Sequence, residues 1–134
     1  MHSTSLKDLS RQIIALGIPP SSTVMIHSSL LKFGIIENGV DGFFKCIMES
    51  LTGDTTIVMP AFTFGYTENR YWSAKETKSE MGALTEFFRN LNDTVRTFHP
   101  IHSVVVTGKY AKDFSECDSL SSFGKGSPFE KLLE

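Results

Sequence analysis

"GVDGFFKCIMESLTGDTTIVMP", residues 39–60, joins two patterns that predict different secondary structures. Residues 39–53 repeat apolar side chains at helical spacing, and Gly53 ends that pattern. Residues 55–60 form a short, β-branched apolar run closed by Pro60, as expected of a buried strand. The stretch therefore predicts a helix followed by a strand, with these apolar positions on one face of the helix: Val40, Phe43, Phe44, Ile47, Met48 and Leu51.

The same alternation of helical and strand patterns extends along the whole chain. Two more apolar runs predict strands at residues 23–28 and 103–108. Helical spacing predicts further helices, the first capped by Thr4 or Ser5 and the last by Ser127, at residues 6–16, 81–92, 109–116 and 127–134. This order is typical of α/β domains. We therefore expect a single domain, residues 1–134, with a three-layer α/β/α fold and a largely parallel sheet. Because the last helical pattern stops at Glu134, we expect the domain to be truncated.

Composition narrows the class of protein. Of 134 residues, 40% are hydrophobic and 21% are charged, as in an ordinary globular domain. The net charge of −2, without a basic run, argues against partners that are nucleic acids or membrane surfaces. Two cysteines are too few for a disulfide framework or a cysteine-based zinc site. There is no apolar signal core and no long apolar span, so we expect a cytoplasmic protein.

A polar turn follows the first predicted strand, where "HSSL" places His27, Ser28 and Ser29 before a loop. Hydroxyls and backbone N–H groups in such a turn suit phosphate or pantetheine oxygens. The local sequence alone favours the simpler alternative, a serine turn that merely closes the strand. His27 and Ser28 cannot form a Ser–His pair, because neighbouring strand residues point to opposite faces. Neither a P-loop nor a dinucleotide fingerprint is present.

Two histidines, His99 and His102, flank Pro100 just before the third predicted strand. Pro100 prevents a regular helix through the pair, and no further ligands stand near in sequence, so a metal site is disfavoured. A histidine can act as a general base near neutral pH, and it can equally be a hydrogen-bonded structural residue. The local sequence favours the structural role and leaves catalysis open.

Five motifs occur together and in order: "HSSL" at 27–30, "VMPAFT" at 58–63, "MGALTE" at 81–86, "RTFHPIHSV" at 96–104 and "GKGSP" at 124–128. In this combination the chain resembles the aminoglycoside 3-N-acetyltransferase family, also called antibiotic N-acetyltransferases. The resemblance extends from about Leu16 to Glu134. Members of this family are about twice as long, so it covers the N-terminal half alone.

The resemblance implies an acetyl-CoA-dependent N-acetyltransferase that acts on an amino group of an aminoglycoside or related amino sugar, without a metal. It also implies a histidine base beyond Glu134, which leaves no catalytic residue assigned here, and it makes His99 and His102 pocket-shaping residues. The alternative is a non-catalytic remnant that binds CoA or a partner. A sheet cut in the middle has an open edge, so we expect self-association. The resemblance implies contact with acetyl-CoA for these residues: His27, Ser28, Ser29, Leu30, Thr63, Met81, Gly82, Ala83 and Ser103.

Overall fold

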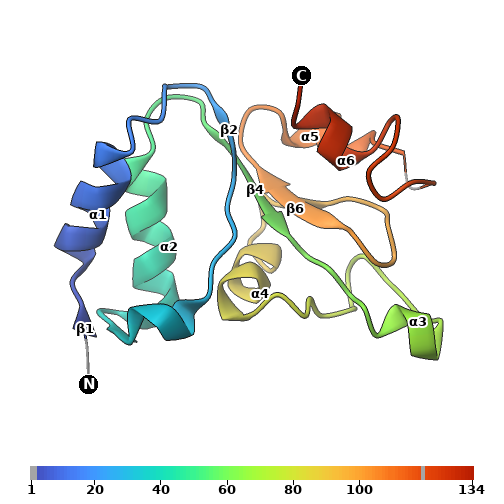
Figure 1. The fold of residues 1–134 in the computed structure, drawn as a ribbon, viewed down its shortest axis with the longest axis horizontal. Coiled ribbons are helices and arrows are strands. Elements are labelled where there is room, and N and C mark those ends of the chain that lie inside the picture. Colours follow the sequence, from blue (N-terminus) through green and yellow to red (C-terminus); the bar gives the residue numbers. More distant parts are fainter. Residues whose placement is uncertain (1–2, 119) are drawn as a thin grey trace.

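A computed structural model describes residues 3–118 and 120–134 of the chain (Figure 1). All the predicted strands and helices are present, with ends that differ by a few residues. The additional elements β1, η1, β3, α3 and β5 are too short to give a periodic pattern. In chain order the elements are β1 (Ser3–Thr4), α1 (Leu6–Ala15), β2 (Thr23–Met25), the 3-10 helix η1 (Leu30–Phe33), β3 (Ile35–Ile36), α2 (Gly39–Ser50), β4 (Thr56–Pro60), α3 (Tyr66–Asn69), α4 (Ala83–Arg89), β5 (Val95–Arg96), β6 (Val104–Thr107), α5 (Ala111–Ser115) and α6 (Pro128–Lys131).

The main sheet has the strand order β2-β4-β6-β5. Only β2 and β4 are parallel, whereas β6 runs antiparallel to both β4 and β5. The prediction of a largely parallel sheet is therefore wrong. The reason is a tight turn between β5 and β6, where the Thr97 N–H donates to the Val104 carbonyl (2.9 Å) and the chain reverses. Because β5 has only two residues, the sequence did not reveal the hairpin.

Two apolar cores cover opposite faces of this sheet, as the predicted three-layer fold requires. Successive side chains of β4 alternate between faces, so Ile57 and Met59 lie in one core and Val58 in the other. The first core packs against α1, α2 and α4, and the second against α5 and α6 (Figure 1). The α/β/α arrangement is confirmed.

Two serines begin helices as predicted. The Ser5 hydroxyl accepts from the Asp8 N–H at the start of α1 (3.3 Å), and the Ser127 hydroxyl accepts from the Glu130 N–H at the start of α6 (3.2 Å). In residues 3–118 and 120–134, no helix has the length and apolar character needed to cross a membrane.

Candidate functional site

The carboxyl ends of β2 and β4 and the amino end of β6 lie together at one end of the sheet. Ile26, which follows β2, donates its N–H to the Val58 carbonyl of β4 (2.8 Å). Beyond β4, the Ala61 N–H donates to the Ser103 carbonyl (2.8 Å), just before β6 begins. Ligands of α/β proteins bind beyond such strand ends. Three predicted parts of the site therefore gather here: residues 27–30, Thr63 and residues 99–103.

The turn after β2 carries polar side chains that are available to a ligand. His27 and Ser29 are exposed and Ser28 is half-buried. In the described part of the chain, no hydrogen bond engages the hydroxyl of Ser28 or Ser29. The backbone closes the turn instead, because the Lys32 N–H donates to the Ser29 carbonyl (3.0 Å) and Leu30 packs against the first core. The hydroxyls of Ser28 and Ser29 therefore take no part in closing the turn.

Thr63 and Ser103 lie deeper, with 2% and 0% of their surface exposed. The Thr63 hydroxyl donates to the Pro100 carbonyl (2.6 Å), and the Ser103 hydroxyl donates to the Ala61 carbonyl (2.9 Å). Both hydroxyls thus connect the segment after β4 to the turn before β6. Their contact with acetyl-CoA stays a prediction, and the structure gives them a bracing role.

Arg96 lies at the centre of these braces, and sequence reasoning assigned it no role beyond its place in the "RTFHPIHSV" motif. Its guanidinium donates to the Ser103 hydroxyl (3.0 Å), the Ala61 carbonyl (2.9 Å), the Ala74 carbonyl (3.2 Å) and the Thr77 carbonyl. Burial, and then the nearby positive charge of a second arginine, lowers the pKa of Arg96 to about 10, so the cation persists at neutral pH. One buried cation therefore fixes the irregular loop after β4 against β5 and β6.

The two histidines of the turn before β6, His99 and His102, share one hydroxyl group. His99 Nδ1 accepts from the backbone N–H groups of Ile101 (3.2 Å) and His102 (2.9 Å), which places the proton of the neutral ring on Nε2. His99 Nε2 lies 3.3 Å from Ser122 Oγ, and Ser122 Oγ lies 2.8 Å from His102 Nδ1. The resulting chain of donors runs from His99 through Ser122 to His102.

Aromatic rings enclose His102. Its ring centroid lies 5.0 Å from that of Phe62, 5.9 Å from that of Phe64 and 4.9 Å from that of Phe123. Burial lowers the pKa of His102 below its ordinary value near 6.5. Burial, and to a lesser extent His102, does the same to the pKa of His99. Both imidazoles are hydrogen-bonded within their loops, and their role as pocket-shaping residues stays a prediction. Within the described residues, no group of three or more metal-binding side chains lies together.

The segment before α4 lies beside the segment that follows β4. The Glu80 N–H donates to the Phe62 carbonyl (2.9 Å), and the Gly65 N–H donates to a Glu80 carboxylate oxygen (2.8 Å). Gly82 has a φ of 105°, a conformation that favours glycine, and it is exposed together with Ala83. The predicted residues Met81, Gly82 and Ala83 therefore lie next to the loop that carries Thr63, and α4 begins at Ala83.

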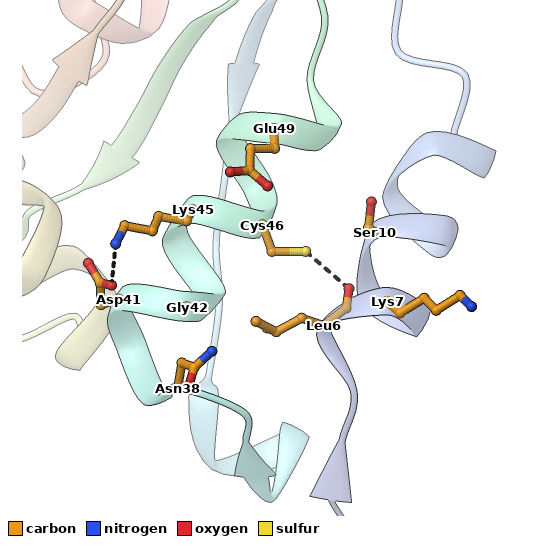
Figure 2. Close-up of a pocket in the computed structure, with 9 residues that line it drawn as sticks. All are labelled: Leu6, Lys7, Ser10, Asn38, Asp41, Gly42, Lys45, Cys46 and Glu49. Carbon is orange, nitrogen blue, oxygen red and sulfur yellow. Dashed lines mark hydrogen bonds and ion pairs between the residues drawn. The ribbon is translucent and has the colours of Figure 1, made fainter.

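One large groove beside the helical layer is not the predicted site. It has a volume of about 640 Å³ and is lined by residues of α1 and α2. Figure 2 shows the Cys46 thiol reaching from α2 to the Leu6 carbonyl of α1 (3.3 Å), and Lys45 paired with Asp41 (2.8 Å) on the side of α2 that faces away from α1. None of the predicted site residues lines it. A second groove, of about 280 Å³, lies along β2 and includes His27 and Ser28.

The sequence profile of the family described as aminoglycoside 3-N-acetyltransferase matches residues 25–134, most of the chain and all the predicted site residues. The chain belongs to the aminoglycoside 3-N-acetyltransferase family. The resemblance drawn from the five motifs is thus confirmed. A relative in this family is the SPbeta prophage-derived aminoglycoside N(3')-acetyltransferase-like protein YokD of Bacillus subtilis (strain 168). It is 25% identical over an alignment 149 residues long, gaps included, which covers 94% of this chain and 55% of YokD.

Solved structures of the family share this fold. The crystal structure of Bacillus subtilis YokD matches 96% of this chain with a TM-score of 0.81 and 23% identity, over 60% of its own length. The binary complex of AAC-IIIb with CoASH matches 97% of this chain (TM-score 0.82, 21% identity, 56% of its own length). Sisomicin-bound AAC-VIa matches 98% (TM-score 0.83, 21% identity, 56% of its own length). The chain spans about half the length of the curated relatives it matches, from 49% to 55%.

Proposed function

We propose that this chain forms the acetyl-CoA-binding part of an N-acetyltransferase whose acceptor is an amino group of an aminoglycoside or related amino sugar. Membership of the family supports the reaction class. The observation that carries the proposal is the gathering of its separate motifs at one end of the sheet, with the hydroxyls of Ser28 and Ser29 free. The AAC-IIIb structure with CoASH supports coenzyme A as the ligand of this fold.

Ser28 and Ser29 are proposed to contact the polar groups of acetyl-CoA directly, and His27 and Leu30 to shape the turn that presents them. Met81, Gly82 and Ala83 provide a second contact surface at the start of α4. Thr63 and Ser103 support the cofactor site indirectly. Their hydroxyls donate to backbone carbonyls and so hold the segment after β4 against the turn before β6. His99 and His102 shape the same wall.

In the proposed reaction, the acceptor amine attacks the thioester carbonyl carbon. The new C–N bond forms, the C–S bond breaks, and the amine proton leaves with a general base while the CoA thiolate departs. We propose that this base lies outside residues 1–134. His99 and His102 are poor candidates, because Nδ1 of each already accepts a hydrogen bond within the turn and its loop. Sisomicin bound to AAC-VIa supports an aminoglycoside acceptor.

The proposal includes a cytoplasmic location, where acetyl-CoA is available. It gives nucleic acids and membrane surfaces no role as partners, and the net charge of −2 supports this. Self-association through an open sheet edge also stays a proposal. It is supported by the strand order β2-β4-β6-β5, which leaves an edge strand at each end of the sheet.

Calorimetric titration of the chain with CoA tests the proposed site. We expect saturable binding that Ser28→Ala and Ser29→Ala each weaken about three- to tenfold, the loss expected for one hydrogen bond. Ser115→Ala is the matched control, because this exposed serine lies on α5, which follows the opposite end of β6. Equal affinity in all variants, or no binding by a folded chain, would reject a CoA site in these residues. If longer forms of the protein bind CoA but transfer no acetyl group, the alternative of a non-catalytic remnant is favoured.

A further inference from the structure

A polar groove of about 370 Å³ lies where the loop before α4 meets the end of that helix and β5; we call it the arginine groove. Among the described residues, its lining includes three basic side chains and no carboxylate: Ala74, Lys75, Arg89, Asn90, Thr94 and Arg96. None of the residues proposed to contact acetyl-CoA lines it. The arginine groove is therefore separate from the proposed coenzyme site.

Two of the basic side chains are held in place by the backbone of one loop. Arg96 donates to the Ala74 carbonyl (3.2 Å), and Arg89 donates to the carbonyl of the next residue, Lys75 (2.7 Å). Both are buried, because only 8% of the Arg89 side chain and 9% of Arg96 are exposed. Guanidinium groups that are already ordered lose little freedom when they bind an anion.

The arginine groove carries an excess of positive charge. Glu86 accepts from Nε of Arg89 (2.7 Å) and from one of its terminal nitrogens (2.9 Å), and so compensates one cation. Three cations against this one carboxylate leave two positive charges uncompensated. Burial, and then the charge of Arg89, lowers the pKa of Arg96 to about 10, as expected when two buried cations repel each other. A bound anion would relieve this repulsion.

Both arginines also retain hydrogen-bond donors. An arginine side chain has five N–H groups. Within residues 3–118 and 120–134, Arg89 uses three of them and Arg96 uses four. Each guanidinium therefore keeps at least one N–H group with which it can bind a ligand.

We propose that the arginine groove binds a dianionic phosphate group, either free phosphate or the phosphomonoester of a larger molecule. Two uncompensated positive charges match a dianion, and guanidinium groups suit the geometry of phosphate oxygens. The exposed Lys75 supplies a third cation on a flexible side chain. The bound phosphate would fasten the loop at Ala74 and Lys75 to α4 and β5. This site does not depend on the proposed acetyl transfer.

NMR titration of the 134-residue chain with sodium phosphate tests the proposal, at about pH 7.5 and at an ionic strength held constant with sodium chloride. The side-chain Nε–H signals of Arg89 and Arg96 report on the groove directly, because both groups are hydrogen-bonded. We expect saturable shifts with a dissociation constant of about 1 mM, as for two charge-assisted hydrogen bonds. Because no CoA or acceptor is present, the outcome is independent of the proposed reaction.

A matched pair of lysine variants separates a site from a general effect of surface charge. Lys75→Ala should weaken phosphate binding about tenfold, because one cation of the groove is lost. Lys78→Ala removes the same charge from an exposed lysine of the same loop that does not line the groove, and it should leave the affinity unchanged. The proposal is overturned if both variants weaken binding equally, or if phosphate shifts neither arginine signal more than chloride does.

Two further ligands define the chemical class. Glycerol 3-phosphate distinguishes the sources of the phosphate group: if it binds as tightly as phosphate, the groove accepts a phosphomonoester of a larger molecule, and if phosphate alone binds, the ligand is the free ion. Acetate carries a single charge and should bind at least about tenfold more weakly than phosphate. Acetate binding as tight as that of phosphate would overturn the assignment of a dianion.

Discussion

Ser122 joins His99 and His102 through one hydroxyl group, at distances of 3.3 Å and 2.8 Å. The contact links the turn before β6 to the loop before α6. It requires neutral imidazoles, because a protonated His102 loses the lone pair on Nδ1 that accepts from Ser122. Sequence reasoning treated the histidines as pocket-shaping residues, and the structure adds the serine that orders them.

We expect the free energy of unfolding to fall as the pH drops from about 7.5 to about 5, the range in which histidines titrate. Burial lowers the pKa of both His99 and His102 in the folded chain. The unfolded chain therefore takes up these protons at a higher pH than the folded chain does. This contribution to stability is complete above the unfolded pKa near 6.5 and is lost as the pH falls through that value toward the folded pKa values. Urea unfolding at a series of pH values measures it.

The variant His102→Gln identifies the source of this pH dependence. Its amide oxygen still accepts a hydrogen bond but cannot be protonated, so the loss of stability in acid should become smaller. Ser121→Ala, beside the shared hydroxyl, should leave the slope unchanged. An identical pH dependence in His102→Gln and the parent chain would show that the histidine contacts do not control acid stability.

At the scale of elements, the end of β6 has the strictest backbone requirement. Gly108 has a φ of +109°, and a Cβ there would lie 2.5 Å from the Thr55 carbonyl oxygen and 2.9 Å from the Thr56 Cα. Both atoms belong to the backbone at the start of β4, which cannot yield as a flexible side chain does. Close approach of β6 to β4 thus depends on the absence of a side chain at this position.

We expect Gly108→Ala to lower the free energy of unfolding by about 3 kcal/mol, because backbone strain and a direct clash combine. Gly17→Ala is the matched control: Gly17 also has a positive φ, of +65°, but no atom lies within 4 Å of its Cβ position. The control should lose about 1 kcal/mol, the cost of a left-handed conformation alone. Chemical denaturation gives both values, and equal losses would contradict the proposed clash.

The same hairpin explains the wrong prediction for the sheet. The apolar runs at 23–28, 55–60 and 103–108 identified the strands, but a run of apolar residues carries no information on its direction. Direction is set by the turn between Thr97 and Val104 and by its bonds to the segment after β4. A two-residue strand such as β5 leaves no periodic trace in the sequence.

At the scale of the whole molecule, the chain spans about half the length of its curated relatives, so the steps of the proposed reaction have to be divided between this half and the rest of the fold. The described site provides hydroxyls and a braced wall, and the proposed general base lies elsewhere. Binding and catalysis should therefore separate in this chain. We expect coenzyme binding to depend on the end of the sheet formed by β2, β4 and β6, and turnover to depend on residues outside this chain.

We expect the 134-residue chain to release no CoA thiol above the uncatalysed rate when it is mixed with acetyl-CoA and sisomicin. The physical reason is that proton removal from the attacking amine contributes roughly 10²- to 10⁴-fold to such reactions. A thiol-reactive dye follows the release, and a full-length family member is the positive control. Robust turnover by the chain alone would place the general base within residues 1–134, and His99 and His102 would then be its candidates.

The sequence by itself determined the family, the alternation of helices and strands, the Ser127 cap and the segments that carry the candidate site. These features depend on local periodicity and on the order of motifs, which a linear chain displays directly. Tertiary structure alone decided the direction of β6, the bracing roles of Arg96, Thr63 and Ser103, and the link through Ser122. Each of these depends on groups many residues apart, such as Ser122 and His99 or Ala61 and Ser103. Burial brings such groups together, and once water is excluded each polar group must find a partner that the sequence order does not specify.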